Sequence, residues 1–142
     1  MIQQLIDNNS SIAMLERVVN FTEQRHDLLL ADIANTSTPD YVQQDVSVAD
    51  FQKSLRKAVE SRTTSQSPTP ESTSTVEFDP HSSALRLHPK DVVASTPFHD
   101  RGIRSMESLM SNLADNAQVH NMATQLLKSR YDLITKAISM KA

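Results

Sequence analysis

Apolar positions recur at helical spacing near the amino end of the chain. One seam returns every seven residues, with a histidine among its members, and comprises Leu5, Ile12, Val19, His26 and Ile33, with Leu15 and Leu29 beside it. A second apolar line follows another side of the same segment and comprises Met14, Val18, Phe21 and Leu28. This pattern predicts one long helix that packs against more than one neighbour.

Residues 105–140 show a similar periodicity on two faces. One face carries Leu109, Leu113, Ala117, Met122, Leu126, Leu133 and Ala137, and the other carries Leu127, Tyr131, Ile134 and Ile138. Basic side chains gather in the latter half, where they complement the negative end of a helix dipole. We therefore expect a second long helix. In the helical layer, we expect Leu5, Ile12, Val19 and Ile33 to face Leu113, Leu126, Leu133 and Ile138.

The segment between the two helices has a different amino-acid composition. Residues 61–75 are mostly Ser and Thr with no apolar side chain, so ordering them would cost chain entropy with no burial to offset it. Residues 76–97 hold scattered apolar positions between prolines, which permits short extended pieces but no long helix. We divide the chain into an N-terminal segment (1–60), a flexible middle (61–100) and a C-terminal helix (101–142).

The stretch ADIANTSTPDYVQQDV, residues 31–46, predicts an abrupt helix end and a turn. Asn35 is suited to a left-handed cap, and Pro39 forbids helical continuation at Thr38. Alternating valines then favour a short extended piece, and Ser47–Asp50 has the form of a capping box before a short helix. The expected fold is mainly α: two long terminal helices paired as a coiled-coil-like hairpin, with a short extended segment, a short helix and a loose Pro/Ser/Thr-rich middle.

Composition narrows the possible functions. A single glycine disfavours phosphate loops and nucleotide-binding fingerprints, and the absence of cysteine excludes disulfides and thiolate metal sites. A net charge of −3 with mixed signs supplies no basic surface for nucleic acid. The amino terminus lacks the basic start and continuous apolar run of a cleavable signal peptide. We therefore expect no enzyme activity, no cofactor, no metal, no nucleic acid and no small-molecule substrate.

Titratable residues form no catalytic pattern. His26 lies on the helix seam, which favours a packed or interfacial histidine over a ligand. His81, His88 and His99 lack the short fixed spacing of a metal site. Asp27 and Asp32 lack an accompanying histidine, lysine and hydroxyl, so we expect them to face solvent or a neighbouring subunit.

The segment LLLADIANTSTPDYVQQDVSVADFQKSL, residues 28–55, resembles the signature of bacterial flagellar rod, hook and hook-associated axial proteins. The matching positions are Ala31, Ile33, Ala34, Asn35, Thr38, Pro39 and Tyr41. Asp32 stands where the family usually has Asn. Asp40 replaces the usual Gly, which favours a type I turn or a left-handed conformation that Asp tolerates. A weaker resemblance covers LADNAQVHNMATQLL, residues 113–127.

The resemblance implies a structural subunit of the flagellar basal-body proximal rod, the hollow drive shaft that transmits torque and surrounds the export channel. Implied partners are other rod proteins, further copies of the chain, a rod-base adaptor, the membrane ring and the export gate. The implied location is the periplasmic rod, reached by type III export without cleavage. Asn35, Thr38, Pro39 and Tyr41 would shape the turn. A small cytosolic helical adaptor or chaperone-like module, which captures another protein's helix with the same apolar stripes, is the alternative.

Overall fold

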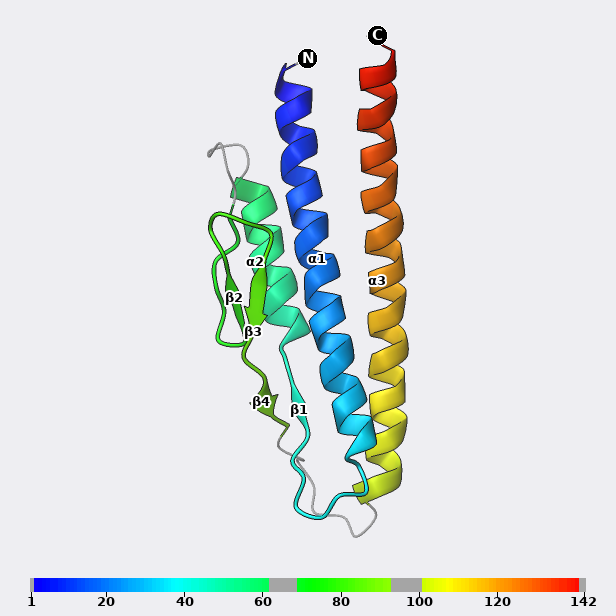
Figure 1. The fold of residues 1–142 in the computed structure, drawn as a ribbon. Coiled ribbons are helices and arrows are strands. Elements are labelled where there is room, and N and C mark those ends of the chain that lie inside the picture. Colours follow the sequence, from blue (N-terminus) through cyan, green and yellow to red (C-terminus); the bar gives the residue numbers. More distant parts are fainter. Residues whose placement is uncertain (1, 62–68, 93–100, 141–142) are drawn as a thin grey trace.

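Two long antiparallel helices form the frame of the molecule, helix α1 (Ile2–Ala34) and helix α3 (Arg101–Ser139). The computed structural model describes residues 2–61, 69–92 and 101–140, and the side chains of 10–61, 69–92 and 106–140. The two helices lie side by side for most of their length, so that both chain ends are at the same end of the molecule (Figure 1). The mainly helical hairpin expected from the periodicity is confirmed.

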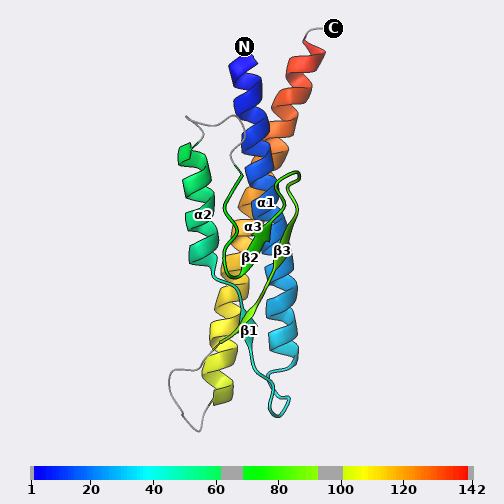
Figure 2. The ribbon, with the colours of Figure 1, turned by 90° about the vertical axis from the view of Figure 1, so that its left-hand side faces the viewer.

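The middle of the chain forms a third layer on α1. It contains β1 (Gln44–Asp45), α2 (Val48–Glu60), β2 (Val76–Phe78), β3 (Leu85–Leu87) and β4 (Lys90–Asp91). Strand β1 pairs antiparallel with β4, and β2 pairs antiparallel with β3, with Val76 opposite Leu87. These elements lie on the side of α1 that faces away from α3, so α1 is the central layer (Figures 1 and 2).

The hydrophobic core lies between α1 and this middle layer. Its buried members are Phe21, Val46, Phe51, Val76 and Phe78. The ring of Phe51 stacks on that of Phe21 with centroids 3.8 Å apart, and on that of Phe78 at 5.9 Å. Val18 and Leu28 pack against the same cluster. The second apolar line of α1 therefore has the additional neighbour that the pattern predicts, and this neighbour is the chain's own middle segment.

Part of the Ser/Thr-rich stretch is more ordered than its composition predicts. Pro70 and Thr75 are buried, although the sequence offers no apolar side chain between residues 61 and 75 apart from prolines. The Thr75 hydroxyl oxygen accepts a hydrogen bond from the Ser47 amide at 3.3 Å, and its carbonyl accepts one from the His88 amide at 2.8 Å. Polar side chains are thus buried here because backbone groups satisfy them. Residues 62–68 and 93–100 of the predicted flexible middle, His99 among them, lie outside the described residues.

Helix α2 begins at the predicted place, but with only one of the two bonds of a capping box, because the Ser47 amide donates to Thr75 and not to Asp50. The Ser47 hydroxyl oxygen accepts a hydrogen bond from the Asp50 amide at 3.1 Å, which satisfies one of the free amides of the first turn. Phe51 and Ala58 on its inner face are buried, whereas Val59 is largely exposed. The cap therefore positions Phe51 at the centre of the aromatic stack.

Candidate assembly surface

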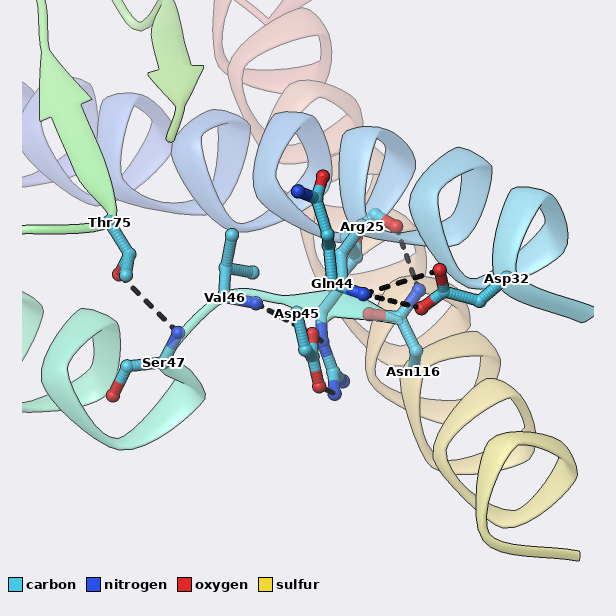
Figure 3. Close-up of polar contacts among 9 residues, drawn as sticks. Arg25, Asp32, Gln44, Asp45, Val46, Ser47, Thr75 and Asn116 are labelled. Atoms are coloured by element: carbon cyan, nitrogen blue, oxygen red, sulfur yellow. Dashed lines mark hydrogen bonds and ion pairs between the residues drawn. The ribbon is translucent and has the colours of Figure 1, made fainter. Parts of the chain in front are cut away.

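The turn after α1 is built around a buried carboxylate. Asp32 is 1 % exposed, and its Oδ1 accepts a hydrogen bond from the Tyr41 hydroxyl at 2.7 Å. The Gln44 amide donates to both carboxylate oxygens at 3.3 Å (Figure 3). The expectation that Asp32 faces solvent or another subunit is wrong, because its partners are the turn residues that follow it. Asp27 is exposed.

The backbone of the turn is left-handed at Asp40, which is one of the two conformations expected there, and it is not left-handed at Asn35. Asp40, at φ 60°, is the only described non-glycine residue in the left-handed region, so the left-handed cap predicted at Asn35 is wrong. Asn35 instead caps through its side chain, whose Nδ2 donates to the Ala31 carbonyl at 2.8 Å. The Thr38 amide donates to the Asn35 carbonyl at 2.9 Å, and the Tyr41 amide to the Thr38 carbonyl at 3.3 Å. Pro39 is exposed between these bonds.

A bidentate ion pair fastens β1 to α1. The Arg25 guanidinium donates from Nε to Asp45 Oδ1 at 2.9 Å and from Nη2 to Oδ2 at 2.7 Å. The side chains of Arg25 and Asp45 are 8 % and 25 % exposed. Asp45 Oδ1 also accepts from the Val46 amide (Figure 3). Helix, turn and strand are therefore connected by charged groups at two points, Asp32 and Asp45.

The contact between α1 and α3 contains a polar node. Asn116 is buried, and its Nδ2 donates to the Thr22 carbonyl at 2.7 Å (Figure 3). The Thr22 hydroxyl donates to the carbonyls of the preceding turn, so its oxygen is able to accept from His120 Nδ1, which lies 2.9 Å away. Because a buried polar pairing is satisfied in one register only, this node selects the alignment of the two helices.

Some of the residues predicted to form the interface are buried or half-buried in the structure, and others are exposed to solvent. Ile12 is buried, and Val19, Ile33 and Leu113 are half-buried, together with His26. Leu126, Leu133 and Ile138 are at least half exposed, so the α1–α3 contact leaves them accessible to solvent. The side chain of Leu5 lies outside the described residues. Buried positions on the α1-facing side of α3 are instead Leu109, Asn116 and Ala123.

An exposed apolar line runs along α3, away from its contact with α1. We call this line the outer stripe and define it as Val119, Met122, Leu126 and Leu133. Val119, Leu126 and Leu133 are seven residues apart, and Met122 lies one turn after Val119, so the stripe has the spacing of a coiled-coil seam. Each member is at least 45 % exposed. Such a seam on a helix that already packs on another side is a surface suited to a further helix.

Two further histidines lie at or next to the β2–β3 hairpin. His88 lies 3.1 Å from the Glu77 carboxylate on the exposed face of the β2–β3 hairpin, and His81 is exposed in the loop between these strands. Among the described residues, no group of three or more His, Asp or Glu side chains is arranged to hold a metal ion. No helix in the described part of the chain has the length and apolar character needed to cross a membrane.

Comparison with known proteins gives no relative. No family model matches the chain, and a search of curated proteins finds no match either. The structure therefore defines only a general class, a helical hairpin with a packed middle layer and an exposed apolar stripe on α3.

Proposed function

We propose that the chain is a structural subunit of the bacterial flagellar proximal rod and assembles helically with other rod proteins around the export channel. The observation that carries the proposal is the resemblance of residues 28–55 to the flagellar axial signature. Within that family the resemblance is nearest to proximal rod protein B, with rod protein C as the nearest competitor. The proposed location is the periplasmic rod, reached through the type III apparatus.

The structure supports this proposal through the surface it leaves uncovered. A subunit of a helical assembly needs a contact that is not used within its own fold, and the outer stripe of α3 offers one. The turn residues of the signature also have defined structural roles. Tyr41 bonds the Asp32 carboxylate, and Asn35 caps α1, so the region of resemblance sets how the chain leaves its first helix.

The proposed partners are copies of the chain, other rod proteins, the rod-base adaptor, the membrane ring and the export gate. The proposal assigns the protein no catalytic role, no cofactor and no small-molecule substrate. Contacts between packed helices would transmit torque, because close-packed side chains are stiff and pass strain from one subunit to the next.

The test is the distribution of the protein between purified flagellar basal bodies and cytosol, measured by immunoblot with a cytosolic enzyme as the contamination control. We expect enrichment in basal bodies that survives washes which remove peripheral proteins. A Leu126→Glu variant is expected to be absent from basal bodies, whereas Met110→Glu, an equally exposed position elsewhere on α3, is retained. Recovery of the wild-type chain only in the cytosol would reject the rod and favour the adaptor.

A further inference from the structure

The surface of α3 contains a depression next to the outer stripe. It has a volume of about 250 Å³, and Ser129, Asp132, Leu133 and Lys136 are among the residues that line it. These four positions are spaced as the four residues that form the hole for one knob in a coiled coil. Ser129 has the smallest side chain of the four, and its size leaves the hole open.

The stripe also contains a knob of suitable shape. Met122 is 59 % exposed and lies two turns before Ser129 along the same seam. Its unbranched side chain adapts to irregular gaps. Since knob and hole lie on one helix, Met122 cannot fill the hole of its own chain. A second copy of the chain supplies both parts in reciprocal positions.

We propose that two copies of this chain pair through their outer stripes in an antiparallel arrangement, with Met122 of each copy in the Ser129/Asp132/Leu133/Lys136 hole of the other. The contact is isologous, because each copy presents the same knob and the same hole. Leu126 of both copies then lies beside the two-fold axis, next to Ser129. This pairing concerns the free chain and does not rest on the flagellar proposal.

Charge complementarity selects the antiparallel direction. In the register set by Met122, Lys136 of one copy lies opposite Val119 of the other, and its ammonium group reaches Asp115 one turn away. Both Asp115 and Lys136 are exposed, and no ion pair is found for either of them within the described residues. A parallel pairing in register would place Lys136 of one copy opposite Lys136 of the other, and Leu133 rather than Met122 would enter the hole.

The position of α1 permits this pairing. Helix α1 and the middle layer lie together on one side of α3 (Figure 1). The side chains of the outer stripe are exposed, so neither α1 nor the middle layer covers them. Ala123, on the α1-facing side of α3, is already buried within the chain. The pair would therefore extend as a row of four helices, with the α3 helices inside and each α1 outside.

The first test is sedimentation velocity of the full chain over micromolar to sub-millimolar concentrations. We expect a reversible dimer that Met122→Ala weakens at least ~tenfold, since the variant removes a buried apolar side chain from both halves of the contact. Met110→Ala is the matched control, because Met110 is exposed to a similar degree (56 %) outside the stripe. Ser129→Phe, which fills the hole, is expected to give a monomer with unchanged circular dichroism.

The second test determines direction by charge and by cross-linking. Asp115→Lys and Lys136→Glu are each expected to weaken the dimer, and the double variant to restore it. Because the chain has no cysteine, Gln118→Cys and Ser139→Cys each introduce the only thiol of their chain. A cross-link between two copies therefore reports the distance between these positions. A bismaleimide is expected to link one variant to the other in a mixture and to leave Gln118→Cys alone unlinked. A monomer at every concentration, or efficient linking of Gln118→Cys to itself, would overturn the proposal.

Discussion

The ion pair between Arg25 and Asp45 allows a sharp test of how burial changes the strength of a charge contact. Two variants remove one partner each and keep most of its shape: Asp45→Asn and Arg25→Met. The chain contains a natural control, the Lys57–Glu71 pair, which has the same closest N–O distance of 2.7 Å but whose side chains are 65 % and 72 % exposed. Distance therefore stays constant between the two pairs while exposure to water differs.

The expected magnitude follows from the bonds and the exposure. Arg25 makes two charge-assisted hydrogen bonds to Asp45, and each such bond contributes about 1.5–3 kcal/mol to stability. Part of this is offset by desolvation of the guanidinium, so we expect a coupling energy of about 2–3 kcal/mol. The exposed Lys57–Glu71 pair is expected to couple by no more than about 0.5 kcal/mol.

The two single variants should differ. Asp45→Asn leaves the guanidinium of Arg25 unpaired at a position where only 8 % of the side chain is exposed, whereas Arg25→Met leaves Asp45 with its bond from the Val46 amide and with 25 % exposure. A charge left without a partner costs more where less water reaches it. We therefore expect Asp45→Asn to lower the free energy of unfolding by about 1 kcal/mol more than Arg25→Met does.

The assay is urea unfolding followed by circular dichroism for both double-mutant cycles, combined with hydrogen exchange measured by mass spectrometry. Loss of the pair should speed exchange in β1 and β4 and leave the α1–α3 contact protected, because both hydrogen bonds described for the Arg25 side chain go to Asp45 in β1. A coupling energy below about 0.5 kcal/mol for Arg25–Asp45, equal to that of the exposed pair, would refute the reasoning.

Three further predictions concern the turn and the core. The hydrogen bond to the Asp32 carboxylate raises the pKa of Tyr41 above its ordinary value of 10.0. The stabilisation that Tyr41→Phe removes should therefore be fully present between neutral pH and pH 10.0 and disappear as pH rises through the folded-state pKa. Free energies of unfolding measured from neutral to alkaline pH test this. Asp40→Ala, which puts a methyl side chain at φ 60°, should lower stability by about 1 kcal/mol in urea unfolding, and Asp40→Gly should not. Phe51→Ala should cost about 3–5 kcal/mol in the same assay, since it removes the central ring of the stack.

The helices, the α2 cap and the need for a second neighbour on α1 could all be predicted from local sequence. Periodicity determines these features, because the residues that share a face lie three or four positions apart. The partners of Asp32 and Arg25 could not be predicted. Asp32 reaches Gln44 across a turn, and Arg25 reaches Asp45 twenty positions later, so each pairing depends on the path of the turn. Periodicity carries no information about that path.

The face of α3 that meets α1 was the feature hardest to predict from the sequence. Leu126 and Leu133 are large and apolar, which favours them for the inner face, yet they are exposed. Asn116 and His120 are polar, which favours the surface, yet Thr22 supplies partners for both inside the contact. Polar residues are tolerated at a helix interface when each finds a specific partner, and a single sequence does not show where those partners lie.

The unequal covering of the two long helices indicates where association with another protein begins. Helix α1 is covered on both apolar sides, by α3 and by the middle layer, so a partner could reach its second face only after the aromatic stack at Phe51 had separated. Exposing each buried aromatic side chain would cost about 1.5–3 kcal/mol, in addition to loss of the Arg25–Asp45 pair. The outer stripe of α3 needs no such opening, because its side chains are exposed already. First contacts are therefore expected at α3, and any contact that uses the second face of α1 must follow release of the middle layer.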